Sequence, residues 1–534
     1  MLTIEQMTPE QKIGRVMCAR RFRNQEDIDF TLELVKKQAC GAIMLPFNEK
    51  TRELAKLYRE AAEYPVIIVN DMETKFPLSK SPFVPLMSLS ACNNLEYVRA
   101  FAANLAKEAK ECGFSGTWGP VIDIQRNNGI YSCSVGRSFT DNPEDTTRFA
   151  EEILKVFDSY NFHGTGKHYP GKSAGGYRDT HMVEGVEFDT EEDLLNYALK
   201  PYLDLMKKDL LPAIMSRHAV YKNIDPDYPA SLSKKVIDII RKQGYDGVIY
   251  TDSLAMMGIL QKYGEKNAMA LAVMAGNDII LPNYRTPTKE VYQMMVDSYY
   301  EGKITDEVLN EAVRRVMVLE EYCDRTPENP YPVPENINEI LENIARDCIT
   351  ADCADGYTPA IDTEKSRLFA VVIPEEYAQG QEQKEVGGEI SMRGWYSPDR
   401  IYDAIKERFP NAQIEFIREY PGSRDNDRVL NAATKYDEVV FVTYCTCAPY
   451  LGSDCMTRRM ESVITALALP KKICALVHFG NPLAIEHIEA IENIPRILYG
   501  YKSPNSQIYA FDVLAGKIEA KGTMPYQTIS KLKR

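Results

Sequence analysis

The sequence predicts an α/β fold in which an N-terminal (β/α)8 TIM-like barrel is followed by a C-terminal α/β sandwich domain. Up to about residue 323, short β-branched runs alternate with longer amphipathic stretches, which is the pattern of a parallel sheet covered by helices. Four prolines within eight residues then interrupt this alternation, and it resumes beyond them. We therefore expect a barrel over residues 1–323, a linker over residues 324–344 and the second domain over residues 345–534.

The expected barrel strands are short runs of aliphatic and β-branched residues bounded by Gly, Pro, Asn or Asp. Six such runs and one weaker run over roughly 320 residues fit a closed barrel better than an open sheet. The runs lie at residues 41–45, 65–71, 119–124, 211–215, 247–252 and 277–281, with the weaker one at residues 161–167.

Helices are expected between these runs, because apolar residues there recur three and four positions apart. The clearest helical stretches lie at residues 94–111, 147–160, 191–208 and 235–243. In the second domain, the strand-like runs lie at residues 369–374, 413–417, 438–444, 473–479 and 496–501, and a helix is expected at residues 462–469.

The bulk composition excludes several functional classes. A formal net charge of −14 opposes unspecific binding to nucleic acid or anionic lipid, because like charges repel. No apolar run reaches the roughly 18 residues of a membrane span, and the N-terminus lacks a signal pattern. The twelve cysteines show no spacing typical of a disulfide framework or a zinc site. We expect a cytoplasmic protein without metal or organic cofactor; the sequence does not indicate its oligomeric state.

The stretch GKHYPGKSAGGYRDTH, at residues 166–181, fits two different patterns. Its first eight residues match G-x-x-x-x-G-K-[ST], the phosphate-binding loop of nucleotide-binding proteins. That loop needs a helix starting at its Lys-Ser, but two glycines soon follow Lys172 and Ser173, and each opposes a helix by about 1 kcal/mol relative to Ala. Asp252 could imitate the magnesium-binding acid of such enzymes, so nucleotide binding stays a minor alternative.

The second pattern concerns histidines. Four of the six histidines lie between His163 and His218. Histidine is the side chain best suited to proton transfer near neutral pH, and a carboxylate two residues away can fix its tautomer. Asp179 and His181 have this spacing. A turn in which Asp179 binds backbone amides would give the same pattern, so the residues alone leave both interpretations open.

An ordered series of short motifs runs through most of the chain. KHYPG at residues 167–171 and DTH at residues 179–181 resemble the Lys-His-Phe-Pro-Gly and Asp-Ser-His motifs of glycoside hydrolase family 3, in its β-N-acetylglucosaminidase branch. TPEQKIGRVM, GPVIDI, VGRSFTDNPE, PASLS and YDGVIYTDSLAMMGI resemble further barrel segments of that family in the same order. GNPLAI and the stretch from ILYGY to DVLAGKI resemble its appended C-terminal domain.

The resemblance implies a retaining exo-β-glycosidase that releases N-acetylglucosamine from small carbohydrate substrates. It assigns the nucleophile to Asp252, which would form a covalent glycosyl-enzyme, and the acid/base role to His181, oriented by Asp179. The implied substrate ligands are Asp71, Arg137, Lys167 and His168. Without the resemblance, Asp252 could instead cap a helix, and the basic residues could be surface charges or ion pairs. We expect His218 to be structural.

Two departures from the family pattern bear on sugar specificity. DMETK begins at Asp71 where the family usually shows Asp-x-Glu-Gly-Gly, and Lys172 and Ser173 replace its usual His-Gly. A β-glucosidase or a glycosyl phosphorylase on the same fold is therefore an alternative. A non-catalytic carbohydrate-binding relative is a further one, because a fold alone does not guarantee activity.

Overall fold

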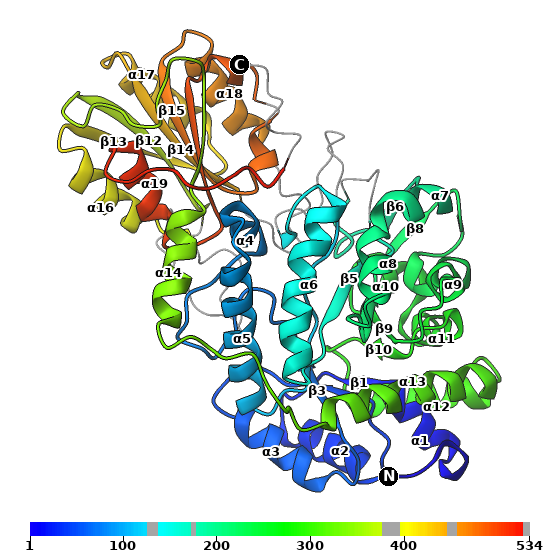
Figure 1. The fold of residues 1–534 in the computed structure, drawn as a ribbon. Coiled ribbons are helices and arrows are strands. Elements are labelled where there is room, and N and C mark those ends of the chain that lie inside the picture. The colour runs from blue at the N-terminus through cyan, green and yellow to red at the C-terminus, as the bar shows by residue number, and fades with distance from the viewer. Residues whose placement is uncertain (125–136, 172–177, 376–395, 446–455, 487, 527–534) are drawn as a thin grey trace. The chain divides into compact units, whose positions relative to one another are not determined.

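The computed structural model describes residues 1–124, 137–171, 178–375, 396–445, 456–486 and 488–526 (Figure 1). The chain forms two compact units, each built from several stretches of sequence. The barrel unit comprises Met1–Ser79, Val98–Ser132 and Pro143–Glu335, and the sandwich unit comprises Lys80–Tyr97, Cys133–Asn142 and Asn336–Arg534.

The barrel unit contains a closed ring of parallel strands. Two four-stranded sheets, in the orders β1-β2-β3-β4 and β10-β9-β7-β5, have only parallel pairings. Parallel bridges join their edges, between Gly116 and His163 on one side and between Met17 and Ile280 on the other. The predicted barrel is thereby confirmed. Its strands are β1 (Cys18–Ala19), β2 (Ala42–Met44), β3 (Ile67–Asn70), β4 (Gly116–Thr117), β5 (Thr165–Tyr169), β7 (Ala213–Ser216), β9 (Val248–Ser253) and β10 (Ile279–Leu281).

Helices surround these strands, as Figure 1 shows. Neighbouring helices contact one another around the ring, as α2 does with α3 and with α12. Their bounds are α1 (Pro9–Arg15), α2 (Gln25–Lys36), α3 (Thr51–Ala61), α5 (Leu95–Glu111), α6 (Pro143–Ser159), α7 (Glu191–Asp193), α8 (Lys200–Met206), α9 (Lys234–Lys242), α10 (Met257–Tyr263), α11 (Glu265–Ala275), α12 (Thr288–Tyr300) and α13 (Asp306–Asp324).

The interior of the barrel is filled by side chains from the strands. Val69, Trp118, Met215 and Tyr250 belong to one buried cluster, together with residues of α13. Because side chains fill the inside of the barrel, a small molecule could reach only the side chains at the carboxyl ends of the strands and in the loops beyond them. The two short strands β6 (Gly185–Glu187) and β8 (Ala219–Tyr221) form a separate parallel pair after β5 and β7.

Two expectations for single elements were wrong, and the first barrel strand was not expected. The strand expected at residues 119–124 is reduced to a bridge between Val121 and Lys167, because Pro120 has no N–H to donate; the ladder lies earlier, at β4. The strand β1 was missed, since its two residues are too short for a periodic pattern. The helix expected at residues 191–208 is divided into α7, a π-helical turn and α8, and Pro201 stands at the start of α8, where its missing N–H interrupts helix hydrogen bonds.

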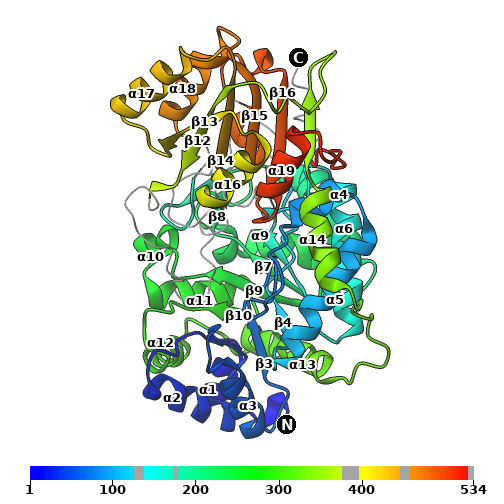
Figure 2. The same ribbon diagram turned by 90° about the vertical axis from the view of Figure 1, so that its left-hand side faces the viewer.

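The sandwich unit has a six-stranded sheet in the order β11-β16-β15-β14-β12-β13, in which only β11 is antiparallel. Helices α16 and α19 contact each other, as do α17 and α18, and Figure 2 shows the two pairs on opposite faces of the sheet. The predicted C-terminal α/β sandwich domain is confirmed. The bounds are β11 (Thr350–Cys353), β12 (Arg367–Ile373), β13 (Ala412–Arg418), β14 (Val439–Cys445), β15 (Ile473–Gly480), β16 (Arg496–Tyr501), α4 (Leu86–Cys92), α14 (Ile337–Asp347), α16 (Pro398–Arg408), α17 (Ser423–Ala433), α18 (Arg458–Ala468) and α19 (Ser506–Leu514).

The segment between the two alternating regions contains the four prolines. The prolines follow α13 directly, and the residues around them have no helix or strand until α14 begins at Ile337. The boundaries at residues 323 and 345 remain a prediction.

Candidate active site

Asp252 lies at the carboxyl end of β9, where the side chains of a parallel barrel become available for chemistry. Its side chain is partly buried. The backbone N–H of Ser253 donates a hydrogen bond of 2.7 Å to the Oδ1 atom of Asp252. One carboxylate oxygen is thus oriented by the backbone. The alternative role as a helix cap does not apply, because Asp252 belongs to the strand and α10 begins only at Met257.

The electrostatic surroundings favour the ionised form of Asp252. Burial alone would raise the pKa of this carboxyl, but the nearby His168, His218 and His181 and the backbone N–H of Ser253 together hold it well below its ordinary value. The carboxylate is therefore available as a nucleophile across the whole physiological pH range.

Asp179 and His181 form a close pair. The Oδ1 atom of Asp179 lies 2.8 Å from Nδ1 of His181 and also accepts a hydrogen bond of 2.9 Å from the backbone N–H of His181. The Asp179 carboxylate is buried, whereas the imidazole keeps about a fifth of its surface exposed. The loop is held against α10, because Met257 N–H donates to the carbonyl oxygen of His181 at 3.0 Å. The contact with Asp179 fixes the orientation of the imidazole through its Nδ1 atom.

A second histidine, His168 on β5, is paired in the same manner. Its Nδ1 atom lies 2.7 Å from Oδ2 of Asp123, and its backbone N–H donates to Oδ1 of the same carboxylate at 3.0 Å. Burial raises the pKa of Asp123, but His168 and Arg217 reverse this effect, so that the pKa is lowered overall. Asp123 was not among the expected site residues, although the motif GPVIDI contains it.

Lys167, also on β5, is buried between two carboxylates. Its Nζ atom lies 2.7 Å from Oδ1 of Asp71 and 2.6 Å from Oε1 of Glu73. Asp71 follows the third strand of the barrel and keeps nearly half of its side chain exposed. The expected ligands Asp71 and Lys167 therefore lie together, and Glu73 joins them. Glu73 was missed, because a carboxylate two residues beyond a strand is too common to single out.

His218 is buried beside these groups. Its Nε2 atom donates to the carbonyl oxygen of Ser253 at 3.0 Å, and its Nδ1 atom lies 2.6 Å from Oγ of Ser231. Burial lowers the pKa of His218, and its neutral form, with the proton on Nε2, fits both contacts. Both ring nitrogens are thus occupied by protein atoms, which agrees with the structural role expected for this residue.

Arg20 is a further residue that sequence analysis missed. It follows β1, and its guanidinium interacts electrostatically with Asp71 and Asp252. No motif marks it, because β1 itself was not recognised. Arg137 belongs to the segment Cys133–Asn142 of the sandwich unit, and its role as a substrate ligand remains a prediction.

The phosphate-loop pattern does not match the local structure. Its first four residues, Gly166–Tyr169, lie in β5 rather than in a loop. Lys172 and Ser173 lie outside the described residues. Within the described ranges, no group of three His, Cys, Asp or Glu side chains could hold a metal ion. None of the helices in the described part of the chain has the length and hydropathy to cross a membrane.

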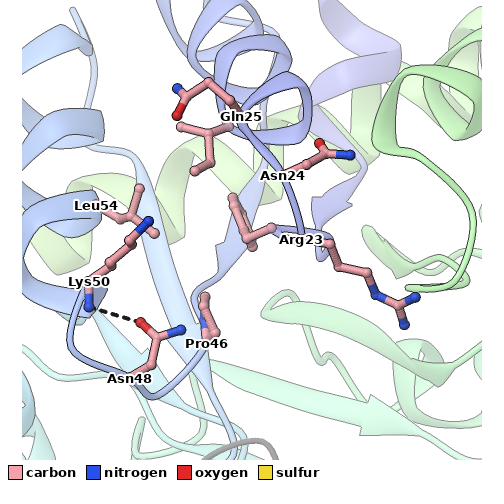
Figure 3. A pocket seen from close by; sticks show the side chains of 9 residues that line it. Arg23, Asn24, Gln25, Pro46, Asn48, Lys50 and Leu54 are labelled. Carbon is pink, nitrogen blue, oxygen red and sulfur yellow. Dashed lines mark hydrogen bonds between the residues drawn. The ribbon is translucent and has the colours of Figure 1, made fainter.

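A small cavity of about 100 Å³ opens between the loops that follow β1 and β2 (Figure 3). Arg23 and Asn24 line it from one loop and Gln25 from the start of α2, and Pro46, Asn48 and Lys50 line it from the other loop. These loops continue from the strand ends that carry Arg20 and Met44, so the cavity borders the same end of the barrel as Asp252.

Comparisons with known proteins match most of the chain. The family model described as the glycosyl hydrolase family 3 N-terminal domain matches residues 8–319. A β-hexosaminidase of Shewanella frigidimarina is 32% identical over 191 residues, which are 33% of this chain and 54% of that protein. One of Psychromonas ingrahamii is 24% identical over 273 residues, which are 50% of this chain and 74% of that protein.

Two solved structures share the fold of nearly the whole chain. A glycoside hydrolase family 3 β-N-acetylglucosaminidase from a Paenibacillus species has a TM-score of 0.78 at 22% identity, and the match covers 97% of this chain and 99% of that one. A β-glucoside phosphorylase has a TM-score of 0.77 at 18% identity, and the match covers 99% and 95% of the two chains. At these identities the likeness concerns the fold.

Proposed function

Because the chain belongs to glycoside hydrolase family 3, we propose that it is a retaining exo-acting β-N-acetylglucosaminidase that removes terminal β-linked sugars from small carbohydrate substrates. The observation that carries the proposal is the pair formed by His181 and the buried Asp179 carboxylate, on a loop near the ionised Asp252. The β-hexosaminidases named above support the choice of sugar. The cytoplasmic location remains a prediction that rests on the sequence alone.

In the first step, the other carboxylate oxygen of Asp252, Oδ2, attacks the anomeric carbon. The glycosidic C–O bond breaks, and the proton on Nε2 of His181 passes to the departing oxygen. This leaves a covalent glycosyl-enzyme and a neutral imidazole. Asp179 stabilises the protonated imidazole before the transfer and keeps the ring in place afterwards.

In the second step, a water molecule enters where the aglycone has left. Nε2 of His181 takes a proton from the water as its oxygen attacks the anomeric carbon, and the bond to Asp252 breaks. Two displacements at the same carbon give net retention of configuration. Phosphate could replace water in this step, because a neutral imidazole does not repel an anion as a carboxylate base would.

The terminal sugar would be held by polar and charged side chains at the strand ends. Lys167 and His168 come from β5 and Asp71 from the end of β3, and Arg137 is proposed as a fourth ligand. Charged groups form strong hydrogen bonds to sugar hydroxyls and fix their orientation. The carboxylates that hold Lys167 and His168 restrict both side chains before the sugar binds.

The proposal is tested with a panel of nitrophenyl β-glycosides, assayed in the presence and absence of phosphate, while NMR follows the anomeric proton of the first product. We expect the N-acetylglucosaminide to be the best substrate and the first product to be the β-anomer. A first product with the α-configuration would contradict the proposed mechanism. A faster reaction with the β-glucoside, or a sugar phosphate as the main product, would instead favour a β-glucosidase or a phosphorylase. Absence of turnover on the whole panel would favour a carbohydrate-binding relative.

A further inference from the structure

The Arg20 guanidinium connects the ends of several barrel strands. Its Nη1 atom donates hydrogen bonds of 2.7 Å to Oγ of Ser253 and 2.9 Å to the carbonyl oxygen of Pro282, with a longer one of 3.4 Å to that of Leu281. Its Nε atom lies 3.3 Å from Sδ of Met44. One side chain after β1 is thus anchored at the ends of β2, β9 and β10.

Ser253 is the residue through which Arg20 reaches Asp252. The Ser253 hydroxyl binds Arg20, its carbonyl oxygen accepts from His218, and its N–H donates to Oδ1 of Asp252. This N–H helps to orient the Asp252 carboxylate through its Oδ1 atom. A displacement of Ser253 would therefore rotate the attacking oxygen away from the anomeric carbon, and small misplacements of reacting groups cost large factors in rate.

Arginine is suited to this role, because its planar guanidinium stays charged at any physiological pH and presents several donors in a rigid arrangement. A lysine ammonium in the same place would keep the charge beside Asp71 and Asp252 but could not reproduce the spacing of the donors. A lysine at position 20 therefore separates the effect of the positions of the donors from the effect of the positive charge.

We propose that Arg20 is a positioning residue for the first covalent step: it holds Ser253, and through Ser253 it holds the Asp252 carboxylate in the orientation for attack. The inference rests on the proposed role of Asp252 as the nucleophile. In this role Arg20 makes no contact with the sugar. Arg20 should consequently affect the rate of bond formation at Asp252 far more than the affinity for the sugar.

The test uses a fluorinated sugar whose covalent intermediate turns over slowly, so that the inactivation rate constant and the affinity of the initial complex are measured separately. We expect Arg20→Met to lower the rate constant roughly 10- to 100-fold with an affinity within about three-fold of the original protein. Arg20→Lys and Ser253→Ala should lower it by smaller factors. In a double-mutant cycle, Arg20→Lys with Ser253→Ala should be no slower than the slower single variant, because both changes break one connection.

Arg21→Met is the matched control. The Arg21 guanidinium binds Asp27 and the carbonyl oxygen of Arg285 instead of Ser253, so its loss should leave the rate constant unchanged. Equal losses of rate and affinity, or fully multiplicative effects of the Arg20→Lys and Ser253→Ala changes in folded protein, would overturn the inference. Failure of the unchanged protein to become labelled at Asp252 would reject the proposed function itself, and the inference with it.

Discussion

Two histidines near Asp252 have the same local geometry but different roles in the proposal. His168 and His181 each bind a carboxylate through Nδ1 and through their own backbone N–H. The pair of Asp179 and His181 could be predicted from sequence, since the residues are two positions apart. The pair of His168 and Asp123 could not, because 45 residues separate them and only the fold brings them together.

Because the two histidines have the same local contacts, comparing their variants tests which of them is the acid/base. His181→Ala should slow substrates with poor leaving groups far more than activated aryl glycosides, because an activated group departs with little protonation. Asp179→Asn should lower turnover by roughly 10²- to 10⁴-fold without unfolding the protein. The turnover of both variants is measured by steady-state kinetics on one activated and one unactivated substrate.

His168→Ala is the matched variant for that experiment. As a sugar ligand, His168 should matter equally for both substrates. If His168→Ala instead showed the strong dependence on the leaving group and His181→Ala did not, the roles of the two histidines would have to be exchanged.

At the scale of elements, the contact between β4 and β5 depends on residues that no periodic pattern reveals. A Cβ atom on Gly116 would lie 2.1 Å from Nδ1 of the His163 ring, so only glycine allows this close approach. The His163 ring stacks against Tyr250, and its Nδ1 atom lies 3.4 Å from Sγ of Cys323. The strand expected at residues 161–167 overlaps β5 only at residues 165–167, and the sequence did not indicate that the buried His163 closes this edge of the barrel through a bridge to Gly116.

The buried His163 predicts a loss of stability in acid. Burial lowers the pKa of His163 from 6.5 to about 3, so that between these values the unfolded chain binds a proton that the folded chain does not. The contribution of the neutral imidazole to the free energy of unfolding is fully present above pH 6.5 and is lost as the pH falls towards 3. The loss reaches about 2 kcal/mol at pH 5. His163→Phe, which cannot titrate, should therefore lose less unfolding free energy between pH 7 and pH 5 than the unchanged protein does. Urea unfolding at the two pH values measures this, and equal losses would refute the prediction.

At the scale of the whole molecule, the sandwich unit is assembled from distant parts of the sequence. The residues Lys80–Tyr97 belong to it, although they precede most of the barrel strands. Within this unit, the Tyr97 hydroxyl donates to Oδ2 of Asp347 at 3.0 Å, and Thr523 N–H donates to the carbonyl oxygen of Ala91 at 2.8 Å. Sequence patterns predicted the alternating strands and helices of both regions and the proline-rich segment between them, because these features depend on residues close together in the chain. They could not predict which early segment joins the later unit, because that depends on packing between residues far apart in the chain.

This assembly has a consequence for a cut chain. A protease site introduced among the prolines at residues 327–334 should give two fragments that stay together, since the first fragment contributes α4 and its neighbours to the sandwich unit. Size-exclusion chromatography after cleavage should show one peak that contains both fragments. Fragments that separate without denaturant would show that the sandwich unit does not need Lys80–Tyr97.

The most direct test of the proposed mechanism is the position of a covalent adduct. When the protein is incubated with a fluorinated, slowly released N-acetylglucosamine analogue and digested, mass spectrometry should find one labelled peptide, with the sugar on Asp252. The variant Asp252→Asn should carry no label, and His181→Ala should still be labelled by an analogue with an activated leaving group. A label on any residue other than Asp252 would contradict the account.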